Sequence, residues 1–439
     1  MLTETQVHEL ANAMMNSLGP GLSIDAGYTY LGQFIAHELL PETHPREERL
    51  TIPRMVTGRM DLESLYGGPS SRPLARGVFN SHYIGAPQDL ERNDFTGVAL
   101  IPERRNDENV VIAQLHRFLQ RLHDTIVARK YGDTEEKARR LLTLLFQLIV
   151  VEDYLRQILE PRVFQSCFRR HERWLGFSPN TTPPEFSHAC FRFGHSMVRN
   201  KYRGFPNEHG KMVTIGELFR TGQRLDPKFL VDWREFFGWP NPGEATQKAF
   251  PIDPFVVDAM SAVGPPQLCA DDATATDKRT SVNVVEINLI AGIEAKLPPG
   301  IVYALSLLTA PNCADLVKTV GYVPVRELWP AFAKALAVRA PTVDIDNLPL
   351  WPYILNEAAV TQNCQRLGTL GSLICAEAIA NAIASAHYSI LRIEPYSIDT
   401  VLNSLGALGQ ELRTIQRDHE HLSTDGRTLS MRHLIEFVL

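Results

Sequence analysis

The sequence lacks the features that mark export or membrane insertion. Its first residues include Glu4 and Glu9 and no basic segment leading into an apolar run, so they do not resemble a secretory signal. The longest apolar stretch, from Leu141 to Val151, is interrupted by Thr143 and Gln147 and is too short to cross a bilayer. We therefore expect a buried core helix at this stretch, no membrane span, and a cytoplasmic location.

Cysteine is also scarce, and no two cysteines are spaced as a Cys-x-x-Cys pair. In a chain of 439 residues without an export signal, scattered cysteines are typical of buried thiols rather than of disulfides or zinc ligands. We expect free thiols in a reducing compartment. The six cysteines are Cys167, Cys190, Cys269, Cys313, Cys364 and Cys375.

Neither sign of charge is in large excess. The chain has 44 Lys and Arg against 50 Asp and Glu, a net charge of −6, and no long block of one sign. Domains that bind nucleic acid usually carry a basic surplus, so we predict no nucleic-acid partner. Hydrophobic residues make up 44% and charged residues 21%, which is the balance of a globular chain with a substantial core.

Strand signals are few, and helical periodicity dominates. The clearest helix is centred on residues 28–40, where Gln33 and His37 lie four residues apart and share one face. Pro41 ends this helix. A region rich in Pro, Gly, Arg and Asp follows from about 41 to 104. Long irregular segments of this kind are often functional.

Six further segments are predicted to be helical from their periodicity, caps and prolines. In one of them, Asp133 and Glu136 form a capping box for a helix that Pro161 ends. No linker is evident, so we expect a mainly α fold, with an N-terminal arm at 1–24 and a single large helical domain at 25–439. The six segments are Asn109 to Lys130, Asp133 to Glu160, His188 to Asn200, Pro330 to Arg339, 370–388 and 397–417.

Three separated segments carry the candidate chemistry. The first is Gly-Gln-Phe-Ile-Ala-His-Glu at 32–38, the second Arg-Arg-Asn-Asp-Glu-Asn at 104–109, and the third Phe-Arg-Phe-Gly-His at 191–195. Each is weak alone, because a single histidine on a helix is usually structural. A run such as the second usually starts a solvated helix, with Asn106 or Asp107 as its cap.

Together the three segments supply the groups that peroxide cleavage at a haem requires. One imidazole binds the iron, while a second takes a proton from one peroxide oxygen and returns it to the other. A guanidinium stabilises the charge that develops as the oxygen–oxygen bond breaks, because it stays protonated. The axial imidazole also needs an acceptor at its other nitrogen, which fixes its orientation and raises its basicity.

The order and spacing of these segments resemble those of the animal haem peroxidase superfamily, especially its short bacterial members. The second segment opens a helix that continues with Gln-Leu-His-Arg-Phe at 114–118. Later blocks agree, namely Ile-Asn-Leu at 287–289 before Leu-Pro at 297–298, and Leu-Gly at 367–368 before Gly371. The resemblance extends from about residue 25 to 385, and it implies a helical domain with haem b between core helices.

The resemblance also implies a role for each distal and proximal residue. It assigns His37 as the distal acid–base histidine, Gln33 as the glutamine that binds water or halide, and Arg105 as the distal arginine. His195 becomes the axial ligand of the haem iron, and Asn288 the acceptor for its ring N–H. The resemblance places one further residue, Arg192, near a haem propionate.

The superfamily's covalent haem links are mostly absent. Vertebrate members form esters from an aspartate just before the distal histidine and from the glutamate of Arg-x-x-Glu. Ala36 stands at the first position, so only Glu108 can form an ester. Asn109 replaces the methionine that forms a sulfonium link in myeloperoxidase. Less distortion of the haem implies a lower iron potential, which favours organic or pseudohalide donors over chloride.

The superfamily also binds calcium beside the distal helix, and residues 57–63 resemble that loop. Alternate-residue oxygen ligands suit a hard cation. The resemblance implies ligands from Thr57, Arg59 (its carbonyl), Asp61, Glu63 and Glu38. Glu38 stands in place of an Asp and Glu63 in place of a Ser or Asp, and both side chains are longer than those they replace. The alternative is an acidic loop solvated by water.

We therefore predict a haem peroxidase whose partners are hydrogen peroxide and a small-molecule electron donor. Two alternatives stay open. A fatty-acid dioxygenase of the same superfamily would need a radical-forming tyrosine near His195, where only Tyr202 is close. A haem-binding protein without turnover would need no distal arginine. A zinc hydrolase is excluded, because His37-Glu38 begins a His-Glu-x-x-His motif whose second histidine is replaced by Pro41.

Overall fold

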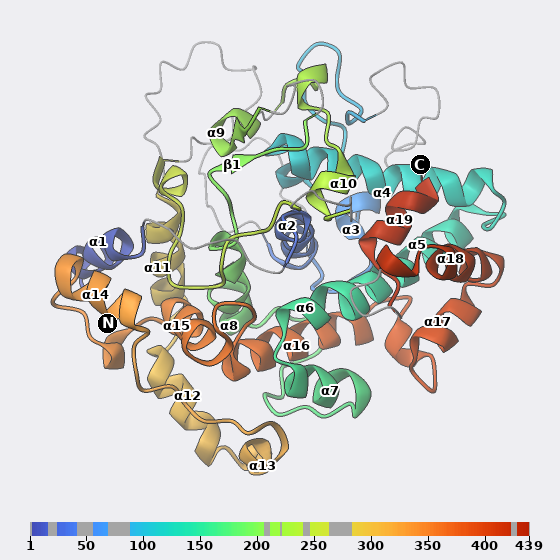
Figure 1. Cartoon of the computed structure of the whole chain (residues 1–439). Helices are drawn as coiled ribbons and strands as arrows, with labels where there is room; N and C mark the ends of the chain where they lie inside the picture. Colours follow the sequence, from blue (N-terminus) through green and yellow to red (C-terminus); the bar gives the residue numbers. More distant parts are fainter. Residues whose placement is uncertain are drawn as a thin grey trace.

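The computed structural model describes residues 2–15, 24–41, 56–68, 88–205, 211–219, 222–239, 246–262, 283–422 and 428–438. This part of the chain is mainly α, as predicted, with one two-residue antiparallel pair of strands, β1 (Lys201–Tyr202) and β2 (Val213–Thr214) (Figure 1). The longer helices are α1 (Glu4–Ala13), α2 (Gly27–Leu39), α4 (Val110–Ala128), α5 (Glu135–Ile149), α7 (Pro161–Arg169), α11 (Val284–Glu294), α12 (Gly300–Thr309), α14 (Pro330–Arg339), α15 (Leu350–Gln362), α16 (Thr369–Ala384), α18 (Ala407–Asp418) and α19 (Met431–Val438). The shorter helices include α3 (Glu63–Tyr66), α6 (Arg156–Ile158), α8 (Pro184–Ser187), α9 (Ile215–Leu218), α10 (Trp233–Phe236), α13 (Leu316–Val320), α17 (Ile398–Ser404) and the 3-10 helices η1 (Arg104–Asp107) and η3 (Cys190–His195).

Helix α2 lies in the middle of the molecule (Figure 1). It is buried on nearly every side, which is the expected environment for a helix that is apolar around most of its circumference. Its neighbours include α4, η1, η3 and the π-helix η2 (Val150–Leu155). One buried helix therefore contacts the elements that carry the other two candidate segments. α1, within the segment predicted as an arm, packs against α11 and α14.

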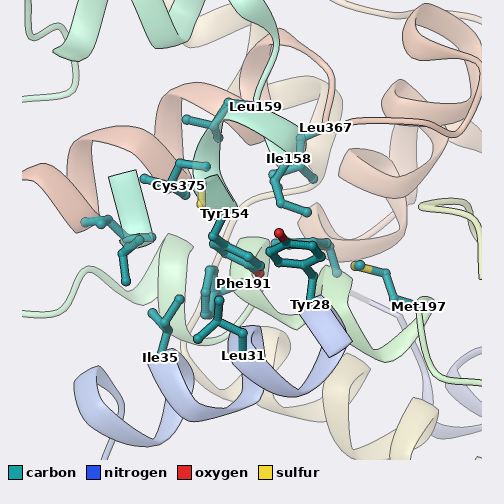
Figure 2. Packing of buried hydrophobic residues seen from close by; sticks show 14 of the residues in the cluster. Tyr28, Leu31, Ile35, Tyr154, Ile158, Leu159, Phe191, Met197, Leu367 and Cys375 are labelled. Carbon is teal, nitrogen blue, oxygen red and sulfur yellow. The ribbon is translucent and has the colours of Figure 1, made fainter. Parts of the chain in front are cut away.

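The packing of α2 against the π-helix depends on Gly32. A Cβ at this position would lie 2.5 Å from the hydroxyl oxygen of Tyr154, so a larger residue would force the Tyr154 side chain or one of the two elements to shift. Tyr28, one turn earlier, stacks near Tyr154 (Figure 2). Its hydroxyl donates to the buried carboxylate of Asp153 at 2.7 Å. The core thus locks α2 in place by both apolar packing and a buried polar contact.

Two of the predicted helix starts need comment. α4 begins after Asn109, whose side-chain oxygen accepts from the backbone N–H groups of the next turn at 3.0 Å. The capping box predicted at Asp133 is wrong. Thr134 is the cap of α5, and it accepts from Lys137 N at 3.2 Å, while Asp133 forms an exposed ion pair with the same lysine. This helical run ends at Ile158, before Pro161 starts α7.

The helix predicted from His188 to Asn200 is also wrong. The chain instead forms the 3-10 helix η3, which ends at His195 and is followed by a turn. Arg192 explains part of the difference, because its Nε donates to the Ser187 carbonyl at 3.1 Å and so occupies an acceptor that a helix would use. Gly194 weakens helix formation further.

Near the C-terminus, the helix predicted at 370–388 forms as α16, and Pro330 opens α14 as predicted. The continuous helix predicted at 397–417 is wrong, because α17 and α18 are separate. Gly406, with φ of +62°, breaks the run between them. This is a backbone conformation that residues with a side chain rarely adopt.

The cysteine prediction is confirmed for the five cysteines in the described residues, all of which are free thiols and four of which are buried. Cys269 lies outside the described residues. Within those same residues, no single helix has both the length and the apolar composition needed to cross a bilayer. α12 and the helical segment after it meet that criterion only as a pair bent by 81°.

Candidate active site

The distal half of the candidate site is built on α2. His37 lies in its last turn, 8% exposed, and Gln33 lies one turn earlier. The Nδ1 atom of His37 is 2.8 Å from the side-chain oxygen of Asn106 in η1. An amide oxygen only accepts, so His37 donates from Nδ1, and its Nε2 then carries the lone pair in the neutral ring. His37 is therefore oriented as a proton acceptor at Nε2.

Asn106 is a residue that sequence reasoning missed. It was considered only as a helix cap, together with Asp107, but Asn109 performs that role. Both Asn106 and Asp107 are buried, at 0% and 5% exposure. The signal that could have identified Asn106 was its place beside Arg105 within the second segment.

Arg105 lies where the second segment meets the end of α2. Its Nη2 donates to the backbone oxygens of His37 at 3.1 Å and Leu40 at 2.7 Å, which satisfies carbonyls at the C-terminus of that helix. The same guanidinium holds the Glu103 carboxylate at 2.9 Å through Nε and through Nη2. The predicted arginine and histidine therefore come together, and Glu103 is a second residue that the sequence did not indicate.

Glu108 and Gln33 also meet. The Gln33 amide nitrogen lies 3.5 Å from a Glu108 carboxylate oxygen, and the Gln33 oxygen lies 3.5 Å from the amide nitrogen of Asn109. Both are long contacts, so the Gln33 side chain is loosely held compared with that of His37. The structure thus gathers the predicted distal residues around the last turns of α2.

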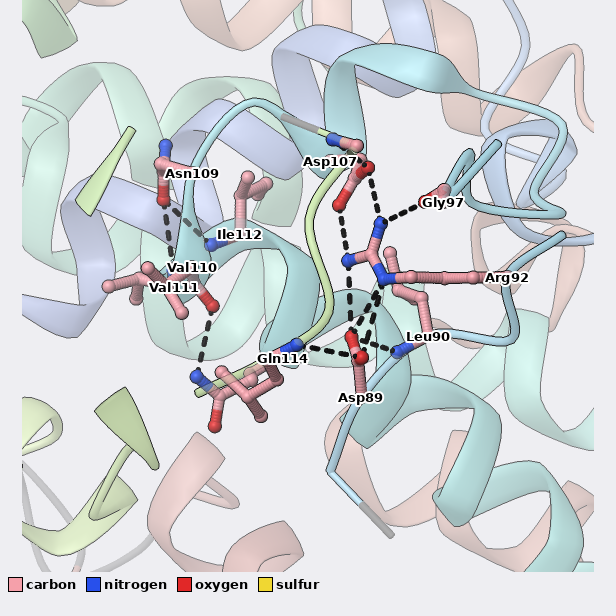
Figure 3. A network of polar contacts seen from close by, with 12 residues as sticks. Asp89, Leu90, Arg92, Gly97, Asp107, Asn109, Val110, Val111, Ile112 and Gln114 are labelled. Atoms are coloured by element: carbon pink, nitrogen blue, oxygen red, sulfur yellow. Dashed lines mark hydrogen bonds and ion pairs between the residues drawn. The ribbon is translucent and has the colours of Figure 1, made fainter. Parts of the chain in front are cut away.

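A buried ion cluster stabilises the conformation of η1, which carries Arg105 and Asn106. Arg92 donates to both carboxylate oxygens of Asp107 at 2.7 Å and to those of Asp89 at 3.1 to 3.3 Å (Figure 3). Asp107 also accepts from Gly222 N at 3.0 Å. Burial raises the pKa of Asp107, although the Arg92 hydrogen bond and charge oppose this. Because Asp107 follows Asn106 directly, this cluster fixes the turn that presents Arg105 and Asn106 to α2.

The proximal half of the site lies at the end of η3. The Nδ1 atom of His195 is 2.7 Å from the Asn288 amide nitrogen, and the Asn288 oxygen accepts from Arg192 Nη1 at 2.6 Å. Asn288 comes from α11, so the structure brings together the third segment and this distant asparagine, with the amide nitrogen rather than the predicted acceptor oxygen facing the ring. Burial, with a contribution from Arg192, lowers the pKa of His195 to about 3, which keeps the ring neutral near pH 7. Burial also lowers the pKa of Arg192 to about 10.

These residues fit an axial haem ligand. Asn288 engages Nδ1, which leaves Nε2 of His195 for the iron. Apart from the chain neighbours of Gly194, no heavy atom of the described residues lies within 4 Å of where a Cβ on Gly194 would be, so there is open space beside the histidine. An iron-bound imidazole carries its proton on Nδ1 and needs an acceptor there. The side-chain oxygen of Asn288 would supply this acceptor if its amide group rotated by half a turn. That rotation requires Arg192 to release its hydrogen bond to the same oxygen.

The two halves of the site share α2. It packs against η1 on the distal side and against η3 on the proximal side. The Thr29 hydroxyl donates to the backbone oxygen of Met197, two residues after His195, at 3.4 Å.

The residues predicted to bind calcium lie beside this helix but bond to one another. The two Glu38 oxygens accept from Glu63 N and Ser64 N at 2.8 Å, so Glu38 caps α3. The Thr57 hydroxyl donates to Glu63 at 2.9 Å, and Asp61 accepts from His387 N at 2.7 Å. Among the described residues, no group of three or more His, Cys, Asp or Glu side chains is arranged to hold a metal ion. Calcium binding, including the part assigned to the carbonyl of Arg59, stays a prediction.

Part of the chain resembles a known protein family. The family described as animal haem peroxidase matches residues 79–236, which include the second and third segments. This part of the chain is therefore similar to the animal haem peroxidase family. Thyroid peroxidases share part of this region, with 26% identity over 154 residues in Mus musculus and 28% over 151 residues in Canis lupus familiaris. These alignments cover 33% and 32% of this chain, but only 16% and 14% of the mouse and dog proteins.

Two solved structures show a similar fold over nearly the whole chain. The fatty acid α-dioxygenase of Oryza sativa superposes with a TM-score of 0.64 at 12% identity, covering 98% of this chain and 81% of that one. The enzyme of Arabidopsis thaliana gives 0.59 at 11% identity, covering 96% and 77%. At these identities the likeness concerns the fold alone, so it confirms the predicted mainly α fold and leaves the reaction to the site residues.

Proposed function

We propose that the chain is a haem peroxidase that reduces hydrogen peroxide to two waters with two electrons from a small organic or pseudohalide donor. The observation that carries this proposal is the hydrogen bond from His37 to Asn106, which leaves Nε2 as the proton-accepting nitrogen. A bound haem supplies an iron that accepts peroxide and stores oxidising equivalents. The protein's task is to move one proton between the peroxide oxygens and to stabilise charge.

Each distal residue has a distinct part in this task. His37 removes the proton from one peroxide oxygen and delivers it to the other, so that water departs. Arg105, held beside the end of α2, contributes positive charge as that oxygen leaves. Gln33, loosely held by its neighbours, is free to bind the water or donor that enters.

The proximal residues hold the cofactor. His195 provides the axial nitrogen, and Asn288 orients the ring from α11. Arg192 is positioned to pair with an anionic group of the cofactor, such as a propionate. Glu108 is the one carboxylate available for an ester, because Ala36 has none. Calcium at the 57–63 loop would require Glu38 and Glu63 to turn away from their present partners.

The proposal is tested by adding hemin to the purified chain and then peroxide. We expect a strong haem absorption band, rapid consumption of peroxide and oxidation of a dye. His195→Ala should lose the haem, while His37→Ala should keep it and react with peroxide slower by several orders of magnitude. A His37→Ala protein that reacts at the wild-type rate would exclude His37 as the base. Haem retention without any peroxide reaction would favour the non-catalytic alternative.

The fold likeness to two plant fatty acid α-dioxygenases favours a second candidate, oxygenation of a fatty acid. Tyr202, the tyrosine nearest His195 in sequence, is fully buried and packs against Tyr30 of α2 with ring centroids 5.6 Å apart. The test is oxygen uptake with linoleate. Uptake by the wild type that is lost in Tyr202→Phe, and that peroxide alone does not produce, would overturn the peroxidase proposal in favour of fatty-acid oxygenation.

A further inference from the structure

A second histidine lies behind the distal histidine, connected to it through a single amide. Asn106 accepts from His37 with its oxygen at 2.8 Å, and its amide nitrogen lies 3.0 Å from Nδ1 of His116. His116 is in the second turn of α4, on a different element from both of the others. Asn106 and His116 are both 0% exposed. The distal base is thus the end of a buried chain of three polar side chains.

The hydrogen-bond requirements of this chain couple the two histidines. Burial lowers the pKa of His116 to about 3, so its ring is neutral and carries one proton. With the Asn106 nitrogen facing it, His116 accepts at Nδ1 and holds its proton on Nε2. Rotating the Asn106 amide by half a turn would exchange the positions of its oxygen and nitrogen. Both histidines would then have to adopt the opposite tautomer, and His37 would carry its proton on Nε2. In that state His37 could not remove a proton from peroxide.

His116 retains a cost that a purely apolar residue would not have. Its Nε2 is buried and has no hydrogen-bond partner among the described residues. An unpaired buried N–H is unfavourable, so His116 gains less from burial than a phenylalanine of similar shape would. What His116 provides, and phenylalanine does not, is the acceptor that Asn106 uses.

We infer that His116, acting through Asn106, is a positioning residue that selects the tautomer of His37 in which Nε2 is unprotonated. This inference rests on the proposed function, because it concerns how the distal base is prepared. The carbonyl of Asn106 gives His37 an uncharged partner, which orients the ring without the strong rise in basicity that a carboxylate would cause.

The test measures the tautomer directly. The full chain is labelled with ¹⁵N-histidine, loaded with hemin and reduced under carbon monoxide, which gives a diamagnetic state suited to NMR. Long-range proton–nitrogen spectra then show which ring nitrogen of His37 carries hydrogen, and the His37→Gln spectrum identifies the signal. We expect His37 to be protonated on Nδ1 in the wild type, and that population to fall in His116→Phe.

Two further variants make the test specific. His116→Gln keeps an acceptor for Asn106 and should restore the wild-type tautomer. His123→Phe changes another buried histidine of α4, bonded to Tyr66 and not to Asn106, and should leave the tautomer unchanged. The second-order rate with peroxide should fall about threefold to tenfold in His116→Phe, the effect of one neutral hydrogen bond, and recover in His116→Gln.

The outcomes separate the inference from the proposed function. His37 protonated on Nε2 in the wild type, or a tautomer that does not respond to His116→Phe, overturns the inference while leaving peroxidase activity intact. A wild-type protein that shows the expected tautomers but never reacts with peroxide overturns the proposed function alone. Equal loss in His116→Phe and His123→Phe would show a general packing effect and would also overturn the inference.

Discussion

Replacing Arg92 by methionine should destabilise the protein strongly, because it leaves two carboxylates buried without their cation. The Arg92 side chain is 2% exposed, and those of Asp89 and Asp107 are 6% exposed. Breaking a buried ion pair by removing one partner typically costs about 3–5 kcal/mol. We expect a loss of that size in the free energy of unfolding, measured by urea denaturation followed by circular dichroism.

The pH dependence of this loss has a definite sign. Burial already raises the pKa of Asp107 in the folded protein, and removing the Arg92 charge raises it further. A carboxyl with a raised folded-state pKa makes the protein less stable as pH rises through the interval between its unfolded and folded values. The deficit of Arg92→Met should therefore shrink on acidification from about pH 7 to about pH 5.

Two controls define the expected magnitude. The pair Arg224–Asp94 has the same 2.7 Å separation but is exposed to 57% and 82%, so Arg224→Met should change stability by less than about 1 kcal/mol. The double variant Arg92→Met/Asp107→Asn should be more stable than Arg92→Met alone, since one buried charge is removed. An Arg92→Met protein as stable as Arg224→Met would refute the reasoning.

Three other changes have expected outcomes. Burial raises the pKa of Glu357 to about 7, so the contribution of Glu357 to stability should fall as pH rises from about 4.5 to 7. The stability of wild type relative to Glu357→Gln should therefore decrease over this interval, as urea denaturation at several pH values will show. Gly32→Ala should destabilise the protein by about 1–3 kcal/mol through overpacking against Tyr154, as thermal unfolding will show. If the Tyr154 hydroxyl is the obstacle, the double variant Gly32→Ala/Tyr154→Phe should recover part of that loss. Glu108→Gln should release all haem into acidified organic solvent if wild type retains some of it, whereas complete release from wild type would show that no ester forms.

Local sequence pattern predicted the elements whose structure is locally determined. α2 and α4 follow from apolar periodicity, and prolines mark the end of α2 and the start of α14. The boundaries of all three lie within a few residues of those expected. The predicted helix through His195 failed, because Arg192 takes the Ser187 carbonyl in a side-chain contact that periodicity does not encode. The capping error at Asp133 arose because Thr134, the next residue, has equal capping chemistry.

The candidate site was predictable only where its residues belong to recognisable motifs. His37, Arg105, His195 and Asn288 could be placed because the order of their segments resembles a known superfamily. The role of a residue such as His116 depends on contacts between different elements, which the sequence pattern does not show. Residues in the second layer of a site therefore became visible only in three dimensions.

The central position of α2 affects how this protein unfolds. Because α2 packs against both η1 and η3, a movement of α2 should affect the distal and the proximal sides of the site together. Partial unfolding that frees α2 from the core should disrupt the distal and the proximal sides of the candidate site in one event. Loss of colour on heating should then coincide with loss of the central helix rather than precede it.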